Sequence, residues 1–264
     1  MLRIVTLTTD WNLSDYYIGV VKANILVNCN DVTIIDISHD ISNFSVVQAG
    51  FLMKSVYKNF PDGTIHLICV GSISEKKENI IVVKFDNQFF ICNNNGLIGL
   101  IIDENQEFQN VAEISISTPN ITFPEKDIFV KTVCKLLRNN FVFEQGITIP
   151  IIKRFPGLTP AIDFQRNRIE GNIIYVDSYG DAITNISKSV FNKINLASYE
   201  IFVGSPTLKI TKISNNYYDV EEGYTVAVFN SLDLLEIAQR NGNLCEMFAL
   251  NNSSPIIITF NNNW

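Results

Sequence analysis

The first half of the chain alternates short apolar runs with helical patterns, and this alternation restricts the fold more than any other feature. The apolar runs are RIVTLTT (3–9), VTIIDIS (32–38) and TIHLICVG (64–71). Segments with helical spacing lie between them, at 14–29 and 42–60. The second segment has the Ser45 and Gln48 spacing of a capping box. Strand–helix–strand alternation predicts a mostly parallel sheet with helices on both faces. We therefore expect a three-layer α/β domain over residues 1–148.

The pattern changes after a stretch that carries three prolines, Pro150, Pro156 and Pro160, and no clean period. We interpret residues 149–169 as a linker. Beyond it, short strand-like runs are separated by turns rich in Gly, Asn and Ser. Such spacing is typical of a small barrel or sandwich, so residues 170–264 are expected to form a smaller all-β domain.

Composition narrows the function classes. The 264 residues carry a formal net charge of -7, which argues against nucleic acid as a partner because binding its phosphates needs clustered Lys and Arg. No apolar run is long enough to span a membrane, and no leader pattern precedes the first strand, so we expect a cytoplasmic protein. Its five cysteines show no CxxC spacing and are interpreted as reduced core residues, and no metal site is predicted.

One carboxylate stands out in the first domain. Asp10 directly follows the first strand, and ligands of parallel α/β sheets bind at the carboxyl ends of the strands. A carboxylate there can accept two hydrogen bonds from a vicinal diol, such as that of a ribose. The alternative is that Asp10 only caps the helix that follows.

Two stretches of the second domain show a related pattern. In YVDSYGDAITNI (175–186), Asp177 and Asp181 flank an aromatic residue and a glycine, which also suits an ordinary turn. In VFNSLDLLEIAQRNGN (228–243), a strand is expected to end at Asn230 and Ser231 and a helix to begin. The first amides of that helix and the Ser231 hydroxyl suit a carboxylate ligand, although a plain N-cap explains them equally.

Seven stretches together carry a family resemblance. They are TLTTDWNLSDYYIGVVKANI, IIDISHDI, NFPDGTIHLICV, FICNNNGLIGLI, TFPEKDIFV, YVDSYGDAITNI and FNSLDLLEIAQRNGN. In this order and spacing the chain resembles the S-adenosylmethionine (SAM) hydroxide adenosyltransferases, the adenosine-forming SAM hydrolases related to the SAM-dependent fluorinases and chlorinases. The resemblance covers almost the whole chain.

The resemblance implies a homotrimer that binds SAM or adenosine between the first domain of one subunit and the second domain of its neighbour, without a further cofactor. By the same resemblance, Asp10 holds the ribose diol, Asp177 meets the methionine amino group, and Ser231, beside Asn230, meets the methionine carboxylate. Phe44 matches an aromatic residue near the reacting carbon. The positions that border adenine are Tyr179, Asp181, Asn185 and Tyr217.

The chain departs from the family where water is activated. Family hydrolases use an Asp, an Arg and a His, and an ungapped match places Gly71, Glu78 and Pro124 at these positions. None of the three replaces the lost group, since Gly and Pro transfer no proton and Glu78 reverses a charge. Four charged residues lie close enough in sequence to replace the missing catalytic groups: Glu75, Lys76, Glu78 and Glu125. Loop residues of these types, however, more often face solvent. We interpret His39 and His66 as structural residues on apolar strands.

Three functions follow from these observations. The first is hydrolysis of SAM to adenosine and methionine by in-line attack of water on C5′, with a diverged water-activating loop. The second is a binding module that keeps the SAM or adenosine pocket but has lost turnover, which the Gly71, Glu78 and Pro124 substitutions favour. The third, attack by a halide, is weaker because Glu75 and Glu78 would repel anions.

Overall fold

The computed structural model divides the chain into two compact units, Met1–Phe155 and Pro156–Trp264. The structure describes residues 3–71, 79–103, 106–114, 121–138, 151–155, 158–194 and 198–261. The division falls inside the stretch that the sequence predicts as a linker, and part of that stretch, Ala161–Asp163, forms strand β7. The exact limits of the two domains stay a prediction.

The first unit contains a mixed sheet whose strands lie in the order β2-β1-β3-β5-β4-β6. Its strands are β1 (Ile4–Thr9), β2 (Thr33–Ser38), β3 (Ile65–Cys69), β4 (Ile80–Phe85), β5 (Gln88–Asn93) and β6 (Asn110–Ile114). Strands β2, β1, β3 and β5 pair in parallel, whereas β4 pairs antiparallel with both β5 and β6. A two-residue turn explains the change of direction, because Asp86 and Asn87 both have positive φ, of 50° and 57°, as tight hairpins require.

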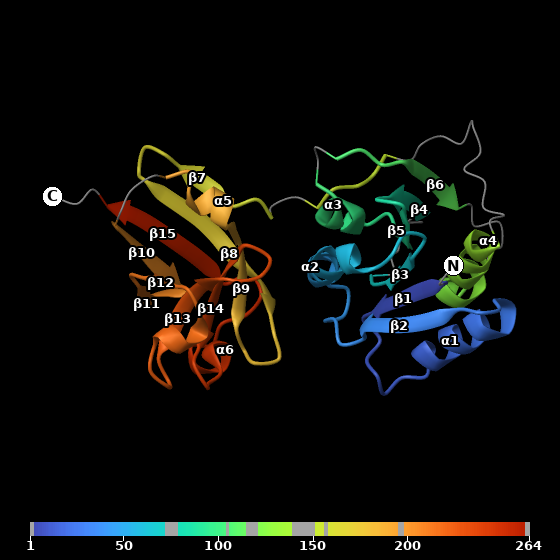
Figure 1. The fold of residues 1–264 in the computed structure, drawn as a ribbon, viewed down its shortest axis with the longest axis horizontal. Coiled ribbons are helices and arrows are strands. Elements are labelled where there is room, and N and C mark those ends of the chain that lie inside the picture. Colours follow the sequence, from blue (N-terminus) through green and yellow to red (C-terminus); the bar gives the residue numbers. More distant parts are fainter. Residues whose placement is uncertain are drawn as a thin grey trace. The chain divides into compact units, whose positions relative to one another are not determined.

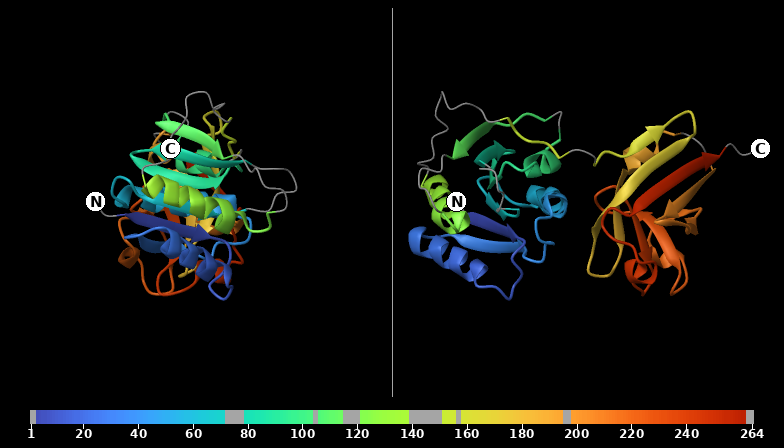
Figure 2. Two further views of the ribbon diagram at one scale, coloured as in Figure 1. Left: turned by 90° about the vertical axis from the view of Figure 1, so that its right-hand side faces the viewer. Right: turned by 180° about the vertical axis from the view of Figure 1, so that it is seen from behind.

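Helices cover both faces of this sheet, which confirms the three-layer α/β architecture. They are α1 (Tyr17–Asn28), α2 (Val46–Val56), α3 (Leu97–Ile101) and α4 (Val130–Leu137). Figures 1 and 2 show α1 and α4 on one side of the strands and α2 and α3 on the other. Val21 and Val133 pack against Leu7 in one core layer, and Met53 and Ile98 belong to the other. A short 3-10 turn, Tyr57–Asn59, follows α2.

The capping box predicted for α2 forms only in part. The Ser45 hydroxyl accepts a hydrogen bond from the Gln48 backbone N–H at 3.4 Å. The Gln48 side chain, however, accepts the N–H of Ser42 at 2.8 Å instead of that of Ser45. The Gln48 side chain thereby holds the start of the loop before α2, which contains Phe44.

The second unit is an all-β domain whose strands curl into a nearly closed, barrel-like sheet, as the sequence predicts (Figure 1). Along the sheet the order is β11-β10-β15-β8-β9-β14-β13-β12, with β7 beside β8. The bounds are β8 (Arg168–Val176), β9 (Ala182–Ser187), β10 (Ser198–Val203), β11 (Ser205–Ile210), β12 (Ile213–Ser214), β13 (Thr225–Phe229), β14 (Leu234–Gln239) and β15 (Pro255–Asn261). The described helical turns are α5 (Lys188–Phe191), Tyr217–Asp219 and α6 (Leu244–Met247).

The prediction of a helix that begins at Ser231 is wrong. Residues 230–233 form a tight turn, and β14 follows it, paired on one side with β13 and on the other with β9. The Asn230 side chain makes the turn by accepting the N–H groups of Leu232 and Leu234 at 3.0 and 3.2 Å, and Asp233 has a φ of 57°. The apolar residues after the turn suit a strand buried on both faces as well as they suit a helix. The sequence pattern alone does not distinguish the two.

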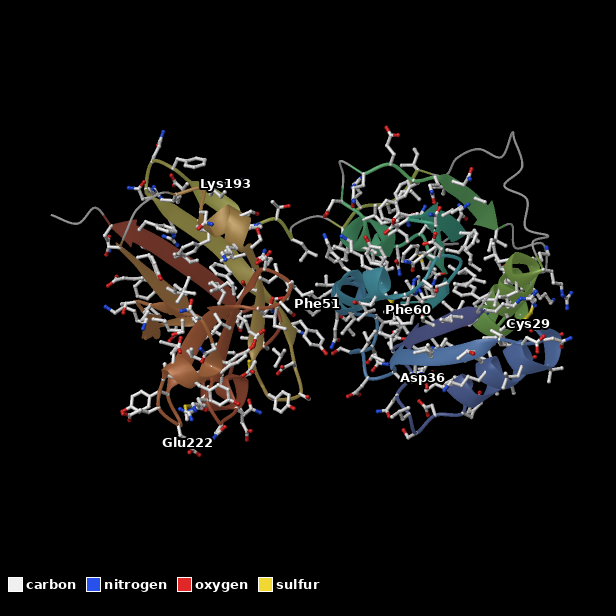
Figure 3. The ribbon with its side chains drawn as sticks, viewed as in Figure 1. Cys29, Asp36, Phe51, Phe60, Lys193 and Glu222 are labelled. Carbon is white, nitrogen blue, oxygen red and sulfur yellow. A yellow bond between two sulfur atoms is a disulfide. The ribbon has the colours of Figure 1, made fainter. Side chains whose placement is uncertain are left out.

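The cysteines also require a correction. Cys29, at the end of α1, and Cys134, in α4, form a disulfide across a sequence separation of 105 residues, which the yellow bond beside Cys29 marks in Figure 3. Their spacing gives no sign of the pairing, because only the packing of α1 on α4 brings them together. Cys69, Cys92 and Cys245 are free and buried, as expected. In the part of the chain that the structure describes, no helix is long and apolar enough to cross a membrane.

The disulfide predicts a redox-dependent stability. Reduction of the wild-type protein should lower its free energy of unfolding by about 2–4 kcal/mol, because a crosslink restricts the unfolded chain. Denaturant unfolding with and without reductant measures the change, and the double variant Cys29→Ser/Cys134→Ser, which has no crosslink, should be indifferent to reductant. Alkylation of both thiols in unreduced, unfolded protein would show that the bond does not form.

Candidate functional site

A cavity of about 230 Å³ opens in the first unit where β1 ends. Four separate segments line it: the residues after β1, the start of α1, the loop before α2 and the turn before α4. The lining residues that matter below are Asp10, Trp11, Tyr17, Phe44, Phe123 and Glu125. The cavity therefore lies at a strand end of the parallel sheet, the place that the sequence indicated for a ligand.

Asp10 is held in one orientation at this cavity. The side chain is only 7% exposed. Its Oδ2 atom accepts the backbone N–H of Phe44 at 2.8 Å and that of Gly71 at 3.3 Å. The Asn43 side chain donates to the Asp10 carbonyl oxygen at 3.0 Å. Asp10 does not cap α1, whose N-cap is Tyr16, so the capping alternative is wrong.

Phe44 is in an unusual backbone conformation. Its φ is +64°, in the left-handed region that bulky residues rarely adopt, and its side chain is 61% exposed. Such conformations persist where surrounding contacts fix them, and they occur often at binding sites. Here the hydrogen bond from the Phe44 N–H to Asp10 is one of those contacts. Backbone strain and the Asp10 carboxylate are thus coupled at one wall of the cavity.

Gly71 and Pro124 have structural roles that explain their residue types. Gly71 has a φ of +67°, which glycine adopts without strain, and it presents its N–H to Asp10. Pro124 has a φ of -60° and precedes the helical turn Glu125–Phe129 and α4, a position that suits proline. Glu78, together with Glu75 and Lys76, lies outside the described residues.

Three aromatic rings also line the cavity. Trp11, Tyr17 and Phe123 contact one another with ring centroids 5.4 to 5.9 Å apart. The faces of such rings attract cations, Trp most strongly. Sequence reasoning did not single out these three residues, although Trp11 follows Asp10 directly and Phe123 precedes Pro124.

In the second unit, polar residues gather around Glu236, which sequence reasoning missed. Glu236 is only 5% exposed. Its carboxylate accepts the Tyr217 hydroxyl at 2.5 Å and the Asn230 side-chain amide at 2.9 Å. Burial, together with this hydrogen bond and the nearby Glu236 charge, raises the pKa of Tyr217. A buried acid in the middle of strand β14 therefore ties together two of the predicted ligand contacts.

Asp177 and Asp181 lie beside this group. Burial and then the charges of Asp177 and Glu236 raise the pKa of Asp181 to about 7, against the opposing effect of a hydrogen bond from the Gln239 backbone. Asp177 uses its Oδ1 atom to accept the N–H groups of Tyr179 and Asp181, both at 2.9 Å. Asp177 therefore stabilises the turn through Oδ1, as the alternative interpretation of this stretch predicts.

The remaining predicted contacts differ in accessibility. The Asn185 side chain accepts the Asn172 N–H and donates to the Leu158 carbonyl oxygen, both at 2.9 Å, so two backbone groups already hold its amide. Tyr179 and Ser231, in contrast, are exposed. The predicted contacts thus fall into two groups: Asp10 and Phe44 in the first unit, and the remaining residues in the second unit.

The two histidines are enclosed in the first unit. His66 lies between the Thr6 hydroxyl at 2.8 Å and the Gln88 side chain at 2.5 Å, and burial lowers its pKa to about 4. His39 is buried and contacts the Thr9 hydroxyl at 2.9 Å and Asp36 at 3.2 Å. Both geometries agree with a structural role. Among the described residues, no group of His, Cys, Asp or Glu is arranged to hold a metal ion.

Comparison with known families and proteins gives consistent results. Residues 5–145 match the SAM hydroxide adenosyltransferase N-terminal domain, and residues 171–257 match the C-terminal domain of the same family. The chain is 23% identical to the (R)-S-adenosyl-L-methionine hydrolase of Methanocaldococcus jannaschii, over 98% of this chain and 97% of the relative. It is 21% identical to the Thermus thermophilus protein of the same name, over 97% and 99%.

Solved structures agree on the fold. An uncharacterized conserved protein from Thermotoga maritima is 25% identical and superposes with a TM-score of 0.84, over 97% of this chain and 99% of that one. A conserved hypothetical protein from Thermus thermophilus, 20% identical over the same shares, gives a TM-score of 0.72. The fold of this chain is thus similar to that of both proteins over nearly their whole length.

The raised pKa of Asp181 predicts a pH-dependent stability. Since the folded-state pKa of Asp181, about 7, exceeds the ordinary value of 3.8, the stability present at low pH is lost as pH rises through 7. Asp181→Asn removes this loss, so its melting temperature should exceed that of the wild type at pH 8.5 but not at pH 4. We expect a difference of about 2–4 °C, since solvent screening limits the effect of a half-buried carboxylate.

The matched control for this experiment is Glu222→Gln, which likewise replaces an acid of the second unit by its amide, but at an exposed position (labelled in Figure 3). Its melting temperature should follow that of the wild type at both pH values. An Asp181→Asn variant that also follows the wild type at pH 8.5 would show that the Asp181 carboxylate is ionised without cost in the folded protein.

Proposed function

Because this chain belongs to the SAM hydroxide adenosyltransferase family, we propose that it hydrolyses S-adenosyl-L-methionine to adenosine and L-methionine. Water attacks C5′ of the ribose in line with the carbon–sulfur bond, and methionine leaves. The sulfonium is already a good leaving group, so the reaction needs no general acid and no cofactor. What the protein must do is hold the sugar, exclude bulk water and position one water molecule.

The cavity in the first unit is the observation that carries this proposal. The Asp10 carboxylate, held by two backbone amides, suits a ribose diol, whose hydroxyls are hydrogen-bond donors. The aromatic wall of Trp11, Tyr17 and Phe123 and the carboxylates at the same cavity suit the positive sulfonium beside that ribose. Phe44 then lies near the reacting carbon. The acidic and aromatic lining of the cavity therefore supports binding of the reacting end of SAM.

The second unit supplies the remaining contacts in this proposal. Asp177 meets the methionine amino group, and its acidic neighbours Asp181 and Glu236 add to the attraction for a cation. Ser231, beside Asn230 in the exposed turn, meets the methionine carboxylate. The adenine ring is bordered by Tyr179, Asp181, Asn185 and Tyr217.

A binding module without turnover is the second candidate, and Gly71 and Pro124 favour it because neither side chain can activate water. Two relatives that match nearly the whole chain, however, carry the name hydrolase. This similarity supports turnover by this chain as well, with a water-activating group that differs from the usual one.

The cysteines bear on the cellular location of the protein in two opposing ways. Three buried free cysteines, Cys69, Cys92 and Cys245, support the cytoplasmic location that we propose. The Cys29–Cys134 disulfide is the observation against it, since such bonds are rare in reducing compartments.

The function is tested directly by incubating the purified protein with SAM and following adenosine and methionine by chromatography. We expect both products in equal amounts, and binding of SAM without product over hours would select the binding module instead. Asp10→Ala should weaken adenosine binding by about 2–4 kcal/mol, or roughly 30- to 1000-fold, because two charge-assisted hydrogen bonds are lost. Isothermal titration calorimetry measures this loss.

The control ligand for Asp10 is 2′,3′-dideoxyadenosine, which lacks the diol. The wild type should bind it much more weakly than adenosine, whereas Asp10→Ala should bind the two ligands alike. Equal discrimination by both proteins would show that another group holds the ribose.

We further propose a homotrimer in which a neighbouring subunit completes the site. The cavity of about 230 Å³ in the first unit is below the range of about 300–1,000 Å³ that small-molecule sites usually occupy, so it suits only part of SAM. Light scattering at micromolar concentration should therefore give three times the chain mass of 29.8 kDa. A monomeric mass would contradict the shared site.

A further inference from the structure

Glu125 is a buried acid at the candidate site, in contrast to the solvent-facing residue that its sequence position suggests. Its side chain is only 3% exposed and lines the same cavity as Asp10. Pro124 explains this placement, because it starts the helical turn and directs the next residue into the first turn, Glu125–Phe129. The turn has π-helical geometry, which is rare and often occurs at functional sites.

Glu125 and Asp10 lie close to a common point. Both carboxylates act on the buried Cys69 thiol at the end of β3, where burial and then the charges of Glu125 and Asp10 raise its pKa. They belong to different segments, since Asp10 follows β1 and Glu125 begins the helical turn Glu125–Phe129 before α4. Two acids from separate segments of the chain thus line one small cavity.

The two acids have different surroundings. Asp10 has one oxygen engaged by the amides of Phe44 and Gly71, in an orientation that suits a bound hydroxyl pair. Glu125 has a side chain longer by one methylene and lines the cavity next to Phe123. When two carboxylates at one site differ in their surroundings, they commonly divide binding and proton transfer between them.

We propose that Glu125 is the proton acceptor for the attacking water, an inference that rests on the proposed SAM hydrolysis. The bond from water oxygen to C5′ forms while the bond from C5′ to sulfur breaks. The electron pair of the broken bond stays on sulfur, which becomes the neutral thioether of methionine. The water proton passes to the Glu125 carboxylate and from there to solvent. No oxidant, reductant or further reactant is needed.

A purely electrostatic role would leave a different signature. A carboxylate that only attracts the sulfonium affects SAM and neutral adenosine unequally and acts mainly on KM. A proton acceptor acts on kcat, contributes about 10²- to 10⁴-fold, and loses its effect when protonated at low pH.

The test compares Glu125→Gln, Glu125→Asp and Glu125→Ala with the wild type in the SAM assay. Glu125→Gln should lower kcat by at least about 100-fold and abolish the acidic limb of the pH–rate profile, while adenosine affinity stays within about threefold. Added formate should restore part of the activity of Glu125→Ala, because it supplies a carboxylate to the vacated space. The matched control is Asp127→Asn, an acid of the same turn whose half-exposed side chain pairs with Lys126, and it should retain wild-type kcat.

The outcomes are distinguishable. A wild type that forms no adenosine refutes the proposed function itself. If the wild type hydrolyses SAM and the kcat of Glu125→Gln stays within about tenfold of the wild-type value, the role of Glu125 is overturned and the proposed function stands. Loss of adenosine binding in both Glu125→Gln and Glu125→Asp would also overturn it, since it would show that Glu125 only maintains the fold of the cavity.

Discussion

The Asp10 carboxylate, with its two backbone amide donors, is the interaction on which the site in the first unit depends. One donor belongs to Phe44, in the loop before α2, and the other to Gly71, directly after β3. A single side chain at the end of β1 therefore fixes two loops that are distant in sequence. The left-handed backbone of Phe44 and the positive φ of Gly71 are both consistent with this arrangement, because each turns an N–H toward the same oxygen.

The sequence was sufficient for features that depend on local pattern. Alternating strands and helices predicted the three-layer first domain, and the position of Asp10 after a strand predicted its place at a cavity. Features that depend on tertiary contacts were missed. The turn before β14 was interpreted as a helix start because Asn caps helices and makes turns alike. Likewise, the Cys29–Cys134 bond needs the packing of α1 on α4.

The candidate site illustrates the same limit more sharply. Glu125 looks like a loop residue in sequence, and only the turn after Pro124 places it inside the cavity. Glu236 looks like one polar residue in an apolar strand, although it accepts hydrogen bonds from Tyr217 and Asn230. Both acids are buried, and burying a charge is costly unless hydrogen bonds or an opposite charge compensate for it. Burial of acids, which no single-sequence pattern reveals, was the most informative signal for function.

The covalent link between α1 and α4 has a topological consequence. The chain between Cys29 and Cys134 contains β2 to β6 with α2 and α3, that is, most of the first unit. A single backbone break anywhere in that loop leaves both pieces attached to each other through sulfur, with β1 on one piece and α4 on the other. Such a nicked molecule keeps its ends at high effective concentration and separates into fragments only when it is both unfolded and reduced.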